Sequence, residues 1–173
     1  MRHEMNADRI GGGGAAGAYE VQRQNAFLLS IDIPSGGKDV IELTLKESDL
    51  PKVELESIDI HYMNEYRKLA GKPKVEDFTF TCHDVIDKHV AKSLYEWWTK
   101  VYDPYTGAIH LAKEYKKDAT LTLLSPDGAT ERTWILIGCW PKKVSLGRGD
   151  MSKADPVGVE VTLAVDKVRA INP

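Results

Sequence analysis

Short runs in which apolar and polar side chains alternate recur along the chain, and turn-forming residues separate them. The run Phe27 to Ile33 ends at Pro34-Ser35-Gly36-Gly37, and Ala119 to Leu124 is followed by Ser125-Pro126-Asp127-Gly128 and a run back to Cys139. A period of two residues is typical of strands that bury one face, and the second case predicts a β-hairpin. The predicted strands are 27–33, 40–45, 53–66, 77–83, 119–124, 130–139 and 157–165, with 67–74 as a charged loop.

One segment shows helical periodicity instead. Asp84 or Asp87 can cap its start, and Asp103-Pro104 stops it. Its apolar residues follow one another at intervals of three and four, a single stripe of a helix: Ile86, Val90, Leu94, Trp97 and Val101. Strands without intervening crossover helices predict a mainly β fold, an antiparallel β-sandwich or barrel with one packed α-helix. The predicted core residues in and beyond this helix are Ile86, Val90, Leu94, Trp97 and Trp134.

Length and charge limit the organisation and the partners. The 173 residues predict one domain, residues 25–173, preceded by a flexible glycine-rich arm, residues 1–24. The net charge of −3 argues against a broad basic surface that holds nucleic acid. No run is long and apolar enough to cross a bilayer, and the N-terminus has no secretion-type apolar segment. We therefore expect synthesis in the cytoplasm and no membrane partner.

The strongest concentration of reactive side chains is Cys82-His83-Asp84 with Asp87 and His89. A thiol and imidazoles could bind zinc or form a nucleophilic pair, but acidic residues before a helix more commonly cap it. The glycines at 12, 14 and 17 have the spacing of a dinucleotide-binding loop, yet no strand precedes them. We therefore predict no enzyme activity, no catalytic or metal site and no cofactor.

The two cysteines are too few for a disulfide scaffold. Cys82 and Cys139 are predicted to be half-buried thiols, with an intersubunit disulfide as the alternative if the assembled particle meets an oxidising environment.

A small antiparallel domain leaves strand edges whose backbone groups must be covered or used. The glycine-rich arm and the long strands with threonine faces fit assembly by strand pairing between copies of the chain.

Several motifs, in one order along residues 25–169, resemble the tail tube subunits of phages with contractile tails and of related contractile injection systems. Arg67 to Lys74 followed by Phe78-Thr79-Phe80 is similar to that family's basic loop and third strand, and Glu96-Trp97-Trp98 to its tryptophan-bearing helix. The remaining motifs resemble its hairpin and final strand: Pro126-Asp127-Gly128, Arg132-Thr133-Trp134, Trp140-Pro141, Asp155-Pro156 and Val159 to Leu163.

The resemblance implies a structural virion protein. Hexameric rings would stack into a hollow tube whose inner wall is an intersubunit β-barrel, and double-stranded DNA would pass through the lumen into the host. Sheath subunits would surround this tube, and baseplate and tail terminator proteins would bind its ends. The resemblance places the protein in the virion tail after its synthesis in the host cytoplasm.

Strand alternation supplies candidates for the lumen. If Ile58, Ile60, Phe78, Phe80, Leu121 and Leu123 face the core, the residues between them face away from it. They could line the lumen, or equally an outer groove or a neighbouring subunit, because alternation determines a face and not what that face meets. These candidates are Asp59, His61, Thr79, Thr81, His83, Thr120 and Thr122.

Three alternatives stay open. A tube subunit of a bacterial secretion or contractile injection system would share the ring-forming design. A monomeric β-barrel would bind a small ligand in a deep apolar pocket within one chain. A hydrolase or metal enzyme would use Cys82, His83 and His89.

Overall fold

A computed structural model describes residues 26–33, 38–86, 89–149, 151–152 and 156–172. The predicted arm, residues 1–24, therefore lies outside the described residues. The elements, in chain order, are β1 (Phe27–Ile31), α1 (Lys38–Thr44), β2 (Leu45–Ser48), β3 (Val53–Tyr62), β4 (Glu65–Val75), β5 (Phe78–His83), α2 (Val90–Thr99), α3 (Ala112–Tyr115), β6 (Lys117–Leu124), β7 (Thr130–Ser145), β8 (Gly158–Ala164) and β9 (Lys167–Asn172).

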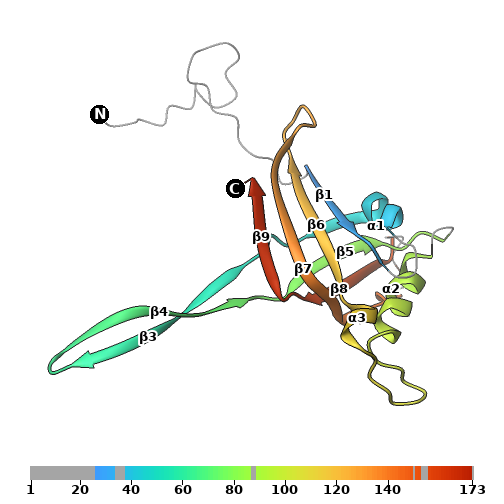
Figure 1. The fold of residues 1–173 in the computed structure, drawn as a ribbon. Helices are drawn as coiled ribbons and strands as arrows, with labels where there is room; N and C mark the ends of the chain where they lie inside the picture. Colours follow the sequence, from blue (N-terminus) through green and yellow to red (C-terminus); the bar gives the residue numbers. More distant parts are fainter. Residues whose placement is uncertain (1–25, 34–37, 87–88, 150, 153–155, 173) are drawn as a thin grey trace, which may run out of the picture.

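Most strands of the described chain join one antiparallel seven-stranded sheet, in the order β1-β6-β7-β8-β5-β2, with β9 beside β7. Its two halves cross in Figure 1: the antiparallel strands β1, β6, β7 and β9 lie along one axis, and β5 and β8 lie across them, with β2 beside β5. A mainly β antiparallel fold with a packed helix is therefore confirmed. The predicted hairpin of residues 119–139 is present as β6 paired with β7.

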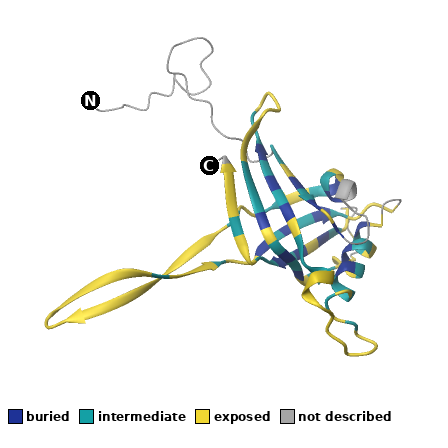
Figure 2. Cartoon of the chain, viewed as in Figure 1, coloured by how far each residue is buried: buried dark blue, intermediate teal, exposed yellow. Residues whose placement is uncertain are grey.

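The core lies between the two halves of the sheet. Alternate side chains of β5, Phe78, Phe80 and Cys82, are at most 2% exposed, and those of β1, β6 and β8 follow the same period of two. Figure 2 shows these buried positions as bands across the strands. These side chains, with those of α1 and α2, thus form one core cluster.

Helix α2 packs on β7 and β8 through Val90, Leu94 and Trp97, all buried. The indole Nε1–H of Trp97 donates a hydrogen bond of 2.8 Å to the carbonyl oxygen of Tyr115. Trp134 is partly buried and packs against the same core. Assigning Ile86 to the core is wrong: α2 begins only at Val90, and Ile86, in the segment before it, is 88% exposed.

Residues 40–45, predicted as a strand, belong mostly to helix α1. Ile41 and Thr44, three residues apart, are buried, whereas Leu43 is 77% exposed. A strand would have placed Ile41 and Leu43 on one face, so the burial follows a helical period. Helix α1 packs against β1 and brings Ile41 into the core.

Strand β7 does not end at Trp140-Pro141 as predicted. It bends at Gly138, whose φ is +70°, and continues to Ser145, pairing first with β6 and β9 and then with β8. A Cβ at Gly138 would lie against Asp166 Oδ2, so this position combines a left-handed backbone with a close approach that only glycine allows. Asp166 leads into β9, a strand that the alternation pattern did not predict.

Strands β3 and β4 form a separate antiparallel ribbon that projects from the body (Figure 1). The prediction of a loop at residues 67–74 is therefore wrong, because these residues continue β4. Ile58 and Ile60, assumed to face the core, are 53% and 50% exposed. Every residue of β3 is exposed, and Figure 2 shows the ribbon exposed along almost its whole length.

Candidate functional site

The described residues of the cluster around Cys82 do not form a catalytic or metal centre, and Asp87 lies outside the described residues. Cys82 is fully buried, and burial raises the pKa of its thiol to about 11, so the thiolate that a nucleophile or metal ligand requires is disfavoured. The N-cap position of α2 is His89, not Asp84, and its side chain makes no capping hydrogen bond. Asp84 instead accepts a hydrogen bond of 3.3 Å from the amide of Ala91 in the first turn. Among the described residues, His, Cys, Asp and Glu side chains form no group of three that could hold a metal ion.

The interpretation of Cys82 and Cys139 as intersubunit thiols is corrected by their burial. Both are free and 0% exposed, so neither sulfur can reach another copy without opening the core. Burial, together with the carboxylate of Asp118, raises the pKa of Cys139 to about 12. Its thiol donates to the carbonyl oxygen of Leu136 at 3.4 Å.

The solvent side of β2, β5 and β8 is a polar face. Thr79 and Thr81 alternate with the buried side chains of β5, and the register sets Thr79 opposite Thr162 and Thr81 opposite Glu160. The hydroxyl oxygens of Thr79 and Thr162 lie 3.5 Å apart. His83 follows on the same side of β5 and is half-buried. Threonine hydroxyls and the ion pair between Glu160 and Lys143, 3.5 Å long, therefore make up this part of the surface.

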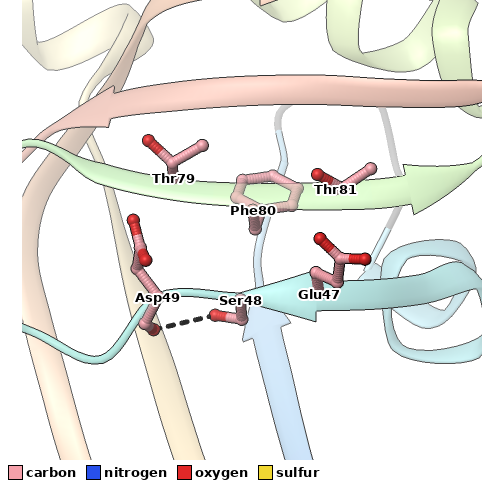
Figure 3. A pocket seen from close by; sticks show the side chains of 6 residues that line it. All are labelled: Glu47, Ser48, Asp49, Thr79, Phe80 and Thr81. Atoms are coloured by element: carbon pink, nitrogen blue, oxygen red, sulfur yellow. Dashed lines mark hydrogen bonds between the residues drawn. The ribbon is translucent and has the colours of Figure 1, made fainter.

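A depression of about 300 Å³ lies at the β2 end of this polar face (Figure 3). The carboxylates of Glu47 and Asp49 flank Ser48 and are directed toward Thr81 and Thr79. The main-chain amide of Asp49 donates to the carbonyl oxygen of Thr79 at 2.9 Å, which holds the end of β2 against β5. The depression thus presents two acidic groups beside hydroxyls.

Thr120 and Thr122 lie on the other half of the sheet and do not join this polar face. They are half-buried on β6, opposite Ser30 and Leu28 of β1. On the other side Thr120 faces Ile135 of β7, so their surroundings include apolar side chains.

The ribbon holds the last two candidates, Asp59 and His61. Across the ribbon Asp59 is opposite Lys68, and His61 is opposite Tyr66, with their ring centres 6.3 Å apart. The seven predicted positions therefore lie in three separate places, the polar face, the β6 face and the ribbon.

The other face of the outer part of the ribbon, residues 57–70, has a stripe of apolar side chains beside Arg67 and Glu65. Ile58 is opposite Leu69 and Ile60 is opposite Arg67, while Tyr62 follows next to the turn. Ile58, Ile60 and Leu69 are half exposed and Tyr62 is 75% exposed. The sequence pattern did not predict this surface, because the charge, glycine and proline of residues 67–74 are typical of a loop. The available signal was the two-residue turn, Met63-Asn64, between two runs that can pair.

Nearer the body, apolar side chains occupy the opposite parity, at Val53 and Leu55 with Pro73 and Val75 across from them. A register shift between Leu55 and Ser57 separates the two parts. The strands cross in Figure 1, so the ribbon turns over between its base and its tip.

The sequence matches no protein-family model and no protein of curated function. The structure, in contrast, resembles solved proteins over nearly its whole length. A chain from the sheath/tube terminator of the extracellular contractile injection system PVC has 18% identity and a TM-score of 0.69, covering 90% of this chain and 99% of that one. A chain from the tube-terminating cap of the anti-feeding prophage has 15% identity and a TM-score of 0.70, covering 94% and 98%.

The Hcp1 protein of E. coli EAEC 042, solved as a double mutant, is more distant, with 14% identity, a TM-score of 0.51 and coverage of 83% and 88%. At such identities the likeness establishes the fold alone. The chain thus has the fold of proteins found in the tubes of contractile injection systems, and the resemblance seen in the sequence is confirmed at that level. Within the described residues, none of the helices combines the length and the apolar character that crossing a bilayer requires.

Proposed function

We propose that the chain is a structural subunit of the inner tube of a contractile apparatus and has no enzymatic role. Copies form hexameric rings, the rings stack into a hollow tube, sheath subunits surround it, and baseplate and terminator proteins bind its ends. Support comes from the fold, which is shared with proteins of sheath–tube complexes, caps and baseplates.

The observation that carries this proposal is the projecting ribbon. A two-stranded hairpin alone is marginally stable in water, and three or more strands or a packed surface are needed for independent stability. This ribbon, roughly 30 Å long from the rise of a strand, also exposes a stripe of isoleucine, leucine and tyrosine side chains. Exposed apolar surface of this kind marks an interaction site, and here we assign it to neighbouring copies.

Negative-stain electron microscopy of the concentrated purified chain tests the proposal. Hollow rods or rings of six-fold symmetry are expected, and single rings that never stack would indicate the terminator role instead. A chain that stays monomeric in sedimentation velocity at every concentration, including the highest that remains soluble, would refute tube assembly.

We further propose that this contractile apparatus is a phage tail and that its tube conducts double-stranded DNA. The polar face of β2, β5 and β8 supports it. Lys46 and Lys143 are ion-paired with Glu47 and Glu160 at 3.3 and 3.5 Å, so beside the threonine hydroxyls these lysines leave no surplus basic charge to retain phosphates. Assembled wild-type tubes should release labelled DNA, whereas tubes carrying Glu160→Lys should retain it in a salt-sensitive way. Equal release from both would show that this face does not line the conduit.

A further inference from the structure

The two strands of the ribbon have opposite charge. Strand β3 has acidic residues and no lysine or arginine, whereas β4 has four basic residues and only one acidic residue, Glu65. The acidic residues of β3 are Glu54, Glu56 and Asp59, and the basic residues of β4 are Arg67, Lys68, Lys72 and Lys74. Since each strand pairs with the other on one side only, the ribbon has one acidic and one basic free edge.

These charges are exposed and poorly compensated within the ribbon. Asp59 lies opposite Lys68 and Glu54 opposite Lys74, but across the described residues no ribbon side chain takes part in an ion pair within 4.0 Å. Arg67 faces Ile60, which has no charge to offer. Both edges are therefore available to a charged partner.

We propose that the acidic β3 edge of one ribbon receives the basic β4 edge of the ribbon of a second copy, so that ribbons join head to tail around the ring. This inference rests on the proposed tube function and names the contact that orders the subunits. When ribbons of rotationally related copies point the same way, β3 of one lies beside an oppositely running β4 of the next. Each contact joins two different surfaces, which is the type of interface that closes into a ring.

The opposite charges of the two edges also disfavour contacts between like edges. Two β3 edges repel each other, as do two β4 edges, so only the head-to-tail order is attractive. Lysine and Pro73 on β4 have a second explanation, because charges and proline on an edge strand commonly prevent aggregation. That explanation predicts that reversing the charges of both edges together does not restore a specific contact, which an experiment can decide.

The experiment uses the full chain in three charge-reversed forms. One carries Glu54→Lys, Glu56→Lys and Asp59→Lys, a second carries Arg67→Glu, Lys68→Glu, Lys72→Glu and Lys74→Glu, and a third carries all seven changes. A control carries Lys100→Glu and Lys113→Glu, two exposed lysines at the end of α2 and in α3, helices that lie away from the ribbon in Figure 1. Circular dichroism melts confirm that the body of each form remains folded.

Sedimentation velocity and electron microscopy then measure assembly. Each of the first two forms should need at least about 100-fold higher concentration than the wild type to form rings, because both of its edges have the same sign. A 1:1 mixture of the two should restore rings, and the seven-fold variant should assemble alone. The control should behave as the wild type.

The inference is overturned if the first two forms assemble like the wild type, or if both the mixture and the seven-fold variant fail while their bodies are folded. Failure of the wild type itself to form rings would instead refute the proposed tube function.

Discussion

Shortening the ribbon should separate its role in assembly from the stability of the body. Replacing residues 55–73 with Asn-Gly joins Glu54 to Lys74, which already face each other, through a turn sequence suited to a tight hairpin. Every residue of β3 is exposed and the ribbon lies outside the core. The free energy of unfolding should therefore change by less than about 1 kcal/mol, and the melting temperature by less than about 4 °C.

The effect on assembly should be large. Ile58, Ile60 and Leu69 are 53%, 50% and 54% exposed, so about half of each side chain remains to be buried. Full burial of such a side chain contributes about 1.5–3 kcal/mol, and half of it about 0.8–1.5 kcal/mol. The three together contribute about 2.4–4.5 kcal/mol for each ribbon, which corresponds to roughly 60- to 2,000-fold in the association constant.

The assay compares the concentration at which rings appear in sedimentation velocity with the thermal melt of the same sample. Ile60→Ser, on the apolar face, should weaken assembly in the same direction, whereas Ser57→Ala, on the opposite face, should leave it nearly unchanged. A shortened chain that forms rings at the wild-type concentration would contradict the assignment of the ribbon to assembly. A shortened chain that loses its cooperative melt would show that the ribbon belongs to the folding unit.

Three further changes test the body of the protein. Trp97→Phe should lower the free energy of unfolding in urea by about 2–3 kcal/mol, because it removes a buried hydrogen bond to a main-chain carbonyl of α3 and some packing volume. Gly138→Ala should cost about 2 kcal/mol or more in the same assay, since its Cβ meets Asp166 at a positive φ, whereas Gly128→Ala, with a positive φ in open space, should cost about 1–2 kcal/mol. Burial raises the pKa of Cys139 from 9.0 to about 12, so the thiol of the unfolded chain loses its proton at a lower pH than that of the folded chain. The free energy of unfolding should therefore fall by up to about 1.4 kcal/mol per pH unit above pH 9. Cys139→Ala should remove that part of the decline.

Elements with one buried face were predictable from the sequence. The β6–β7 hairpin combines alternating residues with Pro126-Asp127-Gly128, and the structure pairs these strands. Helix α2 also follows its apolar stripe at Val90, Leu94 and Trp97. In each case the core imposes a period of two or of 3.6 on the sequence, and that period can be detected without coordinates.

Elements without a buried face, or too short to show a period, could not be predicted. Strand β4 is solvated on both sides, so Arg67 to Lys74 has the charge, glycine and proline expected of a loop. Residues 40–44 of α1 fit both a strand and a helix, and only the burial of Ile41 and Thr44 distinguishes the two. Strand β9 follows Asp166 at the bend of β7, a tertiary feature that leaves no periodic signal.

The residues of the candidate site could also be predicted only in part from the sequence. Alternation correctly set Thr79 and Thr81 on the side of β5 that faces away from Phe80, but it could not show that Glu160 of β8 joins them. It also grouped Asp59 with these threonines, although Asp59 lies on the ribbon. Register between strands decides which side chains share a surface, and register depends on pairing that one sequence does not show.

The ribbon unites two properties that would conflict in a monomer. An exposed apolar stripe on a two-stranded sheet promotes indiscriminate association, while charged edges oppose it. Segregating acidic residues on β3 and basic residues on β4 resolves the conflict, because association is then attractive in one order and repulsive in the others. The apolar stripe would supply the free energy of assembly and the charged edges its direction, so neutralising the edges should increase disordered aggregation even where weakening the stripe reduces all association.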